Sequence, residues 1–231
     1  MNRDAAPRND TQAPAPPGPV DAEDVTTAVR LSVDALATAG DRDWSARAAS
    51  LDWDCWETTE HLADDLFAYA VQLGPRTPPL DTEVPFSFTP SRPGGPALAV
   101  RADRAAGPAG LLQVLEASGA LLAAVVHTSA PGTRAHHVFG VSDPEGFAAM
   151  GVVETLVHTR DVAEGLGGVD WKPPADLCLR VLARLFPDVT VGADPWRTLL
   201  WATGRAKLPD RARRTAWRWY AEPGTGVVTR P

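Results

Sequence analysis

The sequence contains little cysteine, lysine or histidine, and each shortage narrows what the chain can be. Only Cys55 and Cys178 occur in 231 residues. Two cysteines are too few for a disulfide framework, and their spacing does not match a metal site, so we expect reduced thiols. Lysine occurs only at Lys172 and Lys207, and the formal charge of -7 comes without a basic stripe. This balance argues against nucleic acid or an anionic membrane surface as a partner.

We also find no long apolar run and no secretion signal in the amino-acid sequence. We find no apolar run near the roughly 20 residues that a membrane span needs. Residues 1–20 lack the charged start and apolar middle of a signal peptide. No glycine-rich stretch has the strand and helix context of a phosphate-binding loop. We therefore predict a soluble, cytoplasmic protein whose 44% hydrophobic residues build a core.

Composition divides the chain into three predicted parts. The first part is rich in proline and alanine and has too little apolar surface to offset the entropy of ordering, so we expect it to be disordered. The second shows helical periodicity, and the third is short and rich in tryptophan. The parts are a disordered tail over 1–19, a metal-binding helical bundle over 20–168 and a C-terminal segment over 169–231 packed on the bundle.

Apolar residues at helical spacing predict two helices in the first half of the bundle. The first covers 22–40 and ends at a glycine. The second covers 60–74 and also ends at a glycine. Thr58 or Thr59 can cap this second helix, which places His61 in its first turn.

The second half of the bundle follows a long irregular connection. Residues 75–107 are too rich in proline and glycine for a helix, and they predict a crossover or a lid. Helices are then predicted over 108–127 and 144–166. Asp143 is the predicted cap of the last one, followed by a proline at the first helical position, and Ser142 and Glu145 have capping-box spacing. Four helices with one long connection predict a mainly α fold, a four-helix bundle with a crossover between helices two and three.

The C-terminal segment predicts two shorter helices, over 175–186 and 195–203. Its tryptophans carry large apolar area, so we expect them to belong to the core rather than to a binding platform. These residues are Trp196, Trp201, Trp217 and Trp219.

Glu154 and His158 are the first candidates for chemistry. They lie four positions apart in an apolar helical run, so both side chains leave the same face of the helix. One interpretation is a simple pair of hydrogen-bonded side chains. The other is a metal site to which His61 contributes a third ligand, and three such ligands leave open positions on a zinc-type ion.

Three motifs carry a resemblance to a known family. They are "CWETTEHLADDL", "EGFAAMGVVETLVHTRDVAEGLG" after a long crossover, and "WRTLLWATGR". In this order they resemble the DinB-like bundle family, and within it the mycothiol-dependent maleylpyruvate isomerase branch. The resemblance runs from about Val20 to Trp219, and its specific part is the His…Glu-x-x-x-His spacing. It implies a divalent ion, usually zinc, held by His61, Glu154 and His158.

The resemblance also implies mycothiol as a cosubstrate and a small electrophile as the substrate. A divalent cation promotes loss of the thiol proton. The thiolate adds to an activated double bond and then leaves after rotation, which is isomerisation, or stays in the product, which is S-transfer. The residues do not separate these two outcomes. The alternative is a non-catalytic protein that binds a metal or a ligand on the same scaffold. Apolar helix faces also allow a homodimer.

Two further residues have open interpretations. Arg205 resembles a family arginine that faces the substrate and can clamp a carboxylate, or it is a surface arginine after a helix end. Asp161 either accepts a hydrogen bond from the second nitrogen of His158 or forms a salt bridge near Arg160. The family has a larger, mixed C-terminal domain than the short segment after Gly168.

Three histidines lie around the loop before the fourth predicted helix. His127, His136 and His137 can reach the site from there as an acid or a base. For His136 and His137 we favour a solvated loop. Cys55, next to Trp56, is more typical of a small buried residue than of a nucleophile.

Overall fold

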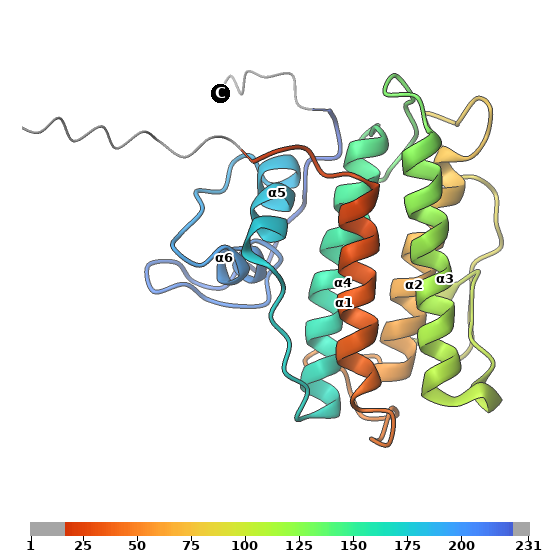
Figure 1. Cartoon of the computed structure of the whole chain (residues 1–231), viewed down its shortest axis with the longest axis vertical. Coiled ribbons are helices and arrows are strands. Elements are labelled where there is room, and N and C mark those ends of the chain that lie inside the picture. Colours follow the sequence, from red (N-terminus) through yellow and green to blue (C-terminus); the bar gives the residue numbers. More distant parts are fainter. Residues whose placement is uncertain (1–16, 224–231) are drawn as a thin grey trace, which may run out of the picture.

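The computed structural model describes residues 17–223, and this part of the chain is mainly helical (Figure 1). The predicted disordered tail over 1–19 therefore lies almost entirely outside the described residues. The predicted mainly α class is confirmed. The helices are α1 (Ala22–Ala37), α2 (Cys55–Leu73), α3 (Gly107–Thr128), α4 (Pro144–Leu166), α5 (Ala175–Leu185) and α6 (Pro195–Ala202).

The four long helices α1 to α4 run side by side, as Figure 1 shows. Helices α1 and α2 each pack against both α3 and α4. Small residues allow close approach at the crossings. A Cβ atom added to Gly151 of α4 would lie 2.5 Å from Leu122 of α3 and 3.1 Å from Leu66 of α2. A larger side chain at this position would require the ends of these leucine side chains to move.

Helix α2 begins five residues before its predicted start. Asp54, and neither Thr58 nor Thr59, is the N-cap: its side chain accepts a hydrogen bond of 2.7 Å from the backbone N of Glu57. The Glu57 carboxylate accepts one of 3.2 Å from the backbone N of Asp54. This capping box satisfies two orphan donors. His61 consequently lies in the second turn of α2, so the predicted cap and the first-turn position are wrong.

The predicted N-cap of α4, Asp143, is confirmed, whereas the predicted capping box is not. Ser142 and Glu145 do not form a capping box, because the Asp143 side chain accepts the hydrogen bond from the backbone N of Gly146 at 2.8 Å. The Ser142 hydroxyl instead donates to the carbonyl of Ala221 at 2.5 Å. An aspartate directly before a proline at the first helical position competed successfully with the serine one residue earlier.

The predicted crossover between α2 and α3 is irregular, with two short strands, β1 (Thr89–Pro90) and β2 (Ala97–Leu98), and a single 3-10 turn, η1 (Arg104–Ala106). Several side chains of α2 fix it, and Gln72 and Asp64 are two of them. The Gln72 amide donates to the carbonyl of Thr82 at 3.1 Å and accepts from the N of Val84 at 2.9 Å.

Asp64 is the second anchor of the crossover. One of its carboxylate oxygens accepts hydrogen bonds from the backbone N atoms of Ala99 and Val100, at 2.8 and 2.6 Å. The crossover is therefore held along α2 at two heights, and it forms a wall beside that helix.

The expectation that the chain has no apolar run long enough to span a membrane is wrong, because one segment is both long enough and apolar enough. The segment Arg104–Thr128, which contains η1 and α3, passes both tests. In the structure one face of α3 packs against α1 and α2. The buried positions on that face include Leu111, Leu115 and Leu122, at helical spacing. Core packing accounts for the apolar composition of this face.

The C-terminal segment packs on the bundle, as the tryptophan content predicted. Helix α5 contacts α4, and Trp196 and Trp219 are buried in the core. Two arginines of α5 also join the segment to the bundle. The Arg180 guanidinium pairs with Asp24 of α1 at 2.5 Å, and that of Arg184 pairs with Asp143 at 2.9 Å.

Candidate metal centre

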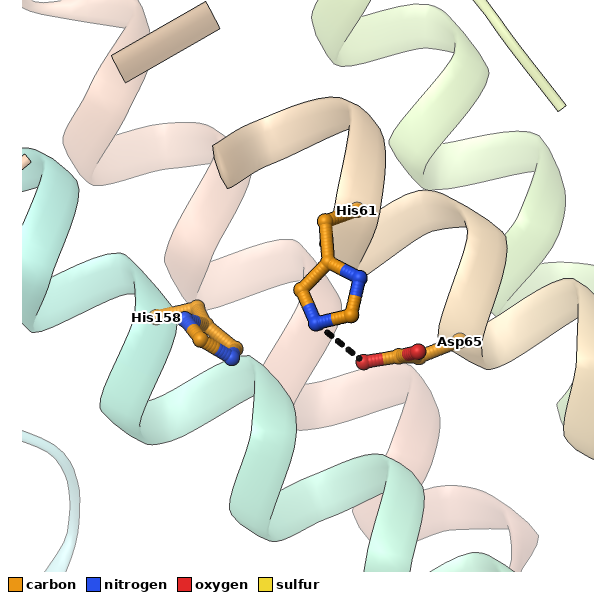
Figure 2. Close-up of side chains that lie close together, drawn as sticks. All are labelled: His61, Asp65 and His158. Atoms are coloured by element: carbon orange, nitrogen blue, oxygen red, sulfur yellow. Dashed lines mark ion pairs between the residues drawn. The ribbon is translucent and has the colours of Figure 1, made fainter. Parts of the chain in front are cut away.

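Two pairs of polar side chains face each other across the contact between α2 and α4. His61 and Asp65 lie four residues apart on α2, with His61 Nε2 3.3 Å from Asp65 Oδ2. Glu154 and His158 have the same spacing on α4, with His158 Nε2 3.1 Å from Glu154 Oε2. The His61 and His158 rings meet edge to face with centroids 5.3 Å apart. Figure 2 shows His61 and Asp65 pointing toward His158.

One group of these residues has the spacing of a metal site. A ligand atom from each of His61, Asp65 and His158 lies within 4.8 Å of the others, so the group can hold a metal ion. Of the three predicted ligands, the two histidines belong to it, and Glu154 adjoins it through His158. Asp65 was missed in the sequence. Its signal was present, because His61-x-x-x-Asp65 repeats the spacing of Glu154-x-x-x-His158.

The electrostatics of the group suit a cation. Burial lowers the pKa of His61 to about 4, and the nearby His158 adds to this shift, so His61 is a neutral ligand near pH 7. Burial, Glu154 and Asp64 together raise the pKa of Asp65 well above its ordinary value. Burial also acts to raise the pKa of Glu154, but its hydrogen bond with His158 and nearby positive charge hold that pKa below its usual value. A half-buried carboxylate whose ionisation is opposed by neighbouring carboxylates favours a bound cation.

Asp161 and Arg205 lie behind His158. Asp161 Oδ2 is 3.6 Å from His158 Nδ1, and that buried nitrogen has no hydrogen-bond partner among the described residues. Arg205 Nε donates to the same oxygen at 2.8 Å. The other oxygen of Asp161 accepts from Arg160 at 3.0 Å. The Arg205 guanidinium therefore faces a carboxylate of the chain itself.

A cavity of about 250 Å³ adjoins the group and includes His61 and Asp65 in its wall. The crossover supplies one side of it, as predicted. His136 and His137 also line the cavity, so the solvated loop favoured from the sequence does not describe them. His136 is held there by a 2.8 Å hydrogen bond from its backbone N to the carbonyl of Pro79.

His137 is the more enclosed of these two histidines. Burial lowers its pKa to about 4, so the ring is neutral near pH 7. Its Nδ1 accepts a hydrogen bond of 3.1 Å from the backbone N of Phe139, which leaves the proton on Nε2. The buried Tyr69 ring, 6.0 Å away, also lines the cavity. A neutral imidazole and a phenol are thus available as hydrogen-bond donors.

Three other residues lie away from this chemistry. His127 is exposed in the last turn of α3 and does not line the cavity. Cys55 and Cys178 are buried, and burial raises the pKa of both thiols to about 12. A thiol with such a pKa is a poor nucleophile at neutral pH.

Comparisons of the chain with protein-family models, with curated proteins and with solved structures found no match. The geometry of the candidate metal centre is therefore the main structural basis for a function.

Proposed function

We propose that this chain is a metal-dependent enzyme of the DinB-like bundle type. It would activate a low-molecular-weight thiol, mycothiol, for isomerisation of a small electrophile or for S-transfer to it. One observation carries this proposal: donor atoms of His61, Asp65 and His158 converge within 4.8 Å beside a cavity. The order of motifs described above adds the family and the thiol.

The donor set fits a zinc-type divalent ion. Imidazole and carboxylate are ordinary ligands of such ions, and three protein ligands leave one position of a tetrahedral shell open, as catalytic sites require. His61, Asp65 and His158 would hold the ion. Glu154, whose Oε2 lies 3.1 Å from His158 Nε2, is the fourth candidate.

An ion bound there would supply a Lewis acid that lowers the pKa of a thiol. The residues of the chain supply the rest. Asp161 and Arg205 stabilise the orientation of His158 from behind. Tyr69 and His137 line the cavity and can donate hydrogen bonds to the electrophile as negative charge develops on it. The enclosing crossover limits access of water to the reacting groups.

Elemental analysis of the purified protein tests the proposal. We expect about one equivalent of a divalent metal in the wild type, a large loss in His158→Ala, and no loss in the control His127→Ala, which removes an exposed histidine. Titration of the metal-loaded wild type with mycothiol should then release a proton.

Each other outcome has a distinct meaning. Metal without thiol binding would contradict the enzyme and leave a non-catalytic metal-binding protein. Absence of metal after reconstitution would contradict both, and Glu154 and His158 would then be a simple hydrogen-bonded pair.

A further inference from the structure

The wall of the cavity combines apolar side chains with carboxylates. Val84 and Phe88 of the crossover and Phe147 of α4 supply apolar surface. Asp64 and Glu83 line the same cavity. Among the described residues that line it, none is a lysine or an arginine. A bound anion would therefore lack the guanidinium or ammonium partner that carboxylate recognition normally uses.

Two arginines that could serve as an anion clamp already pair with carboxylates of the chain. Arg205 pairs with Asp161 at 2.8 Å. Asp161 contacts His158 on the side of the ring away from His61 and Asp65. Arg92, on the crossover, pairs with the buried Glu57 at 2.6 Å. Releasing Arg92 would leave the buried Glu57 without its charge partner. Releasing Arg205 would leave the buried Asp161 with Arg160 alone. Both changes are costly.

A bound divalent ion does not reverse the charge of the wall. Its two positive charges would be balanced by the carboxylates of Asp65 and Glu154. Asp64 and Glu83 would remain. Asp64 is fixed in place by the backbone hydrogen bonds from Ala99 and Val100 described above. Charges in a partly enclosed cavity act on a ligand more strongly than they would in water.

We infer that this cavity selects a ligand with an apolar body and no negative charge, so that the electrophile of the proposed enzyme is neutral or cationic and not a dicarboxylate. The identification of this ligand as an electrophile rests on the proposed function. The charge selectivity itself concerns binding alone and can be measured without metal analysis, thiol or turnover.

Two isosteric probes separate charge from shape. Methyl phenyl sulfone and benzenesulfonate share a ring and a tetrahedral sulfur, differ by one negative charge, and are both weak ligands for divalent metals. Their dissociation constants are measured by ligand-observed NMR on the protein as purified. We expect the sulfone to bind at least fivefold more tightly than the sulfonate. The Phe147→Ala variant should weaken sulfone binding, which places the probe in the cavity.

A charge change on the wall provides the matched test. Glu83 is exposed on the crossover and makes no hydrogen bond or ion pair with other described residues, so Glu83→Lys changes charge without removing a contact. It should reduce the preference for the sulfone several-fold. Glu116→Lys makes the same change at an exposed position of α3 and should leave the preference unchanged.

Three results would overturn the inference: equal or tighter binding of the sulfonate, no binding of either probe, or the same response in both lysine variants. None of them bears on the proposed function, which fails through metal content and thiol titration. A protein without metal that still prefers the sulfone would keep the cavity's selectivity and lose the enzyme.

Discussion

The Arg205 guanidinium binds Asp161, with its Nε and Nη2 atoms each 2.8 Å from the same oxygen, Oδ2. That oxygen also faces Nδ1 of His158 at 3.6 Å. The C-terminal segment thus contacts the candidate metal centre through a charge pair behind one ligand. We propose that Arg205, in this position, helps to orient the candidate ligand His158, a different role from the substrate clamp that the family resemblance implies.

Replacement of Arg205 should therefore affect metal binding more than substrate binding. Arg205→Met removes the partner of the Asp161 oxygen that faces His158 and leaves Asp161 held by Arg160 alone. Loss of an outer partner of a metal ligand typically lowers metal affinity about 10- to 100-fold. We expect a loss of that size in a competition titration with a chelator, and no loss for Arg197→Met, an exposed arginine of α6. Unchanged metal affinity combined with weaker substrate binding would restore the clamp.

The two carboxylates of the site should lower the stability of the metal-free protein and increase its affinity for metal. Burial and Glu154 together raise the cost of ionising Asp65. Asp65→Asn removes one negative charge and keeps the shape. Without metal, we expect its free energy of unfolding to match or exceed that of the wild type by up to about 1 kcal/mol. With metal, the wild type should gain stability and the variant should gain far less.

Urea unfolding with and without added zinc measures both effects. Glu154→Gln is the companion variant, because the sequence named Glu154 as the ligand and the structure adds Asp65. A metal-dependent gain that survives in Asp65→Asn and disappears in Glu154→Gln would show that Asp65 is not a ligand.

The depressed pKa of His61 makes a prediction for the pH dependence of the metal-free protein. The folded-state pKa is about 4, below the ordinary 6.5. The contribution of His61 to stability is therefore fully present above pH 6.5 and is lost as pH falls toward 4. Between pH 7 and pH 5 this amounts to about 2 kcal/mol. The difference in urea-unfolding free energy between wild type and His61→Gln should shrink by that amount, and a constant difference would contradict it.

Local patterns predicted the helices well, because a helix is specified by periodicity and by stop signals within a few residues. Helix α4, predicted over 144–166, has those bounds in the structure. The start of α2 was missed because several residues near it can cap a helix. The capping box of Asp54 and Glu57 competed successfully with Thr58, and propensity at one position does not decide such a competition.

Local spacing predicted only those site residues that share one helix, and His61 was added to them as a candidate third ligand from another helix. The spacing of Glu154 and His158 is visible in the sequence, and the same spacing in His61 and Asp65 was available but not used. The pairing of Arg205 with Asp161 joins residues 44 positions apart. It depends on how the segment after α6 reaches α4, which no local pattern specifies.

Gln72 offers a test of whether the crossover is a fixed wall. Its side-chain amide is the partner of both the carbonyl of Thr82 and the N of Val84. Gln72→Met keeps the volume and removes both hydrogen bonds, so it should lower the free energy of unfolding by about 1–3 kcal/mol. Hydrogen exchange at the Val84 amide should accelerate more than exchange within α4. Gln113→Met, at an exposed position of α3, should change neither quantity. Unaltered exchange at Val84 in the Gln72 variant would mean that the crossover is held by other contacts, and the cavity would then keep its shape without this anchor.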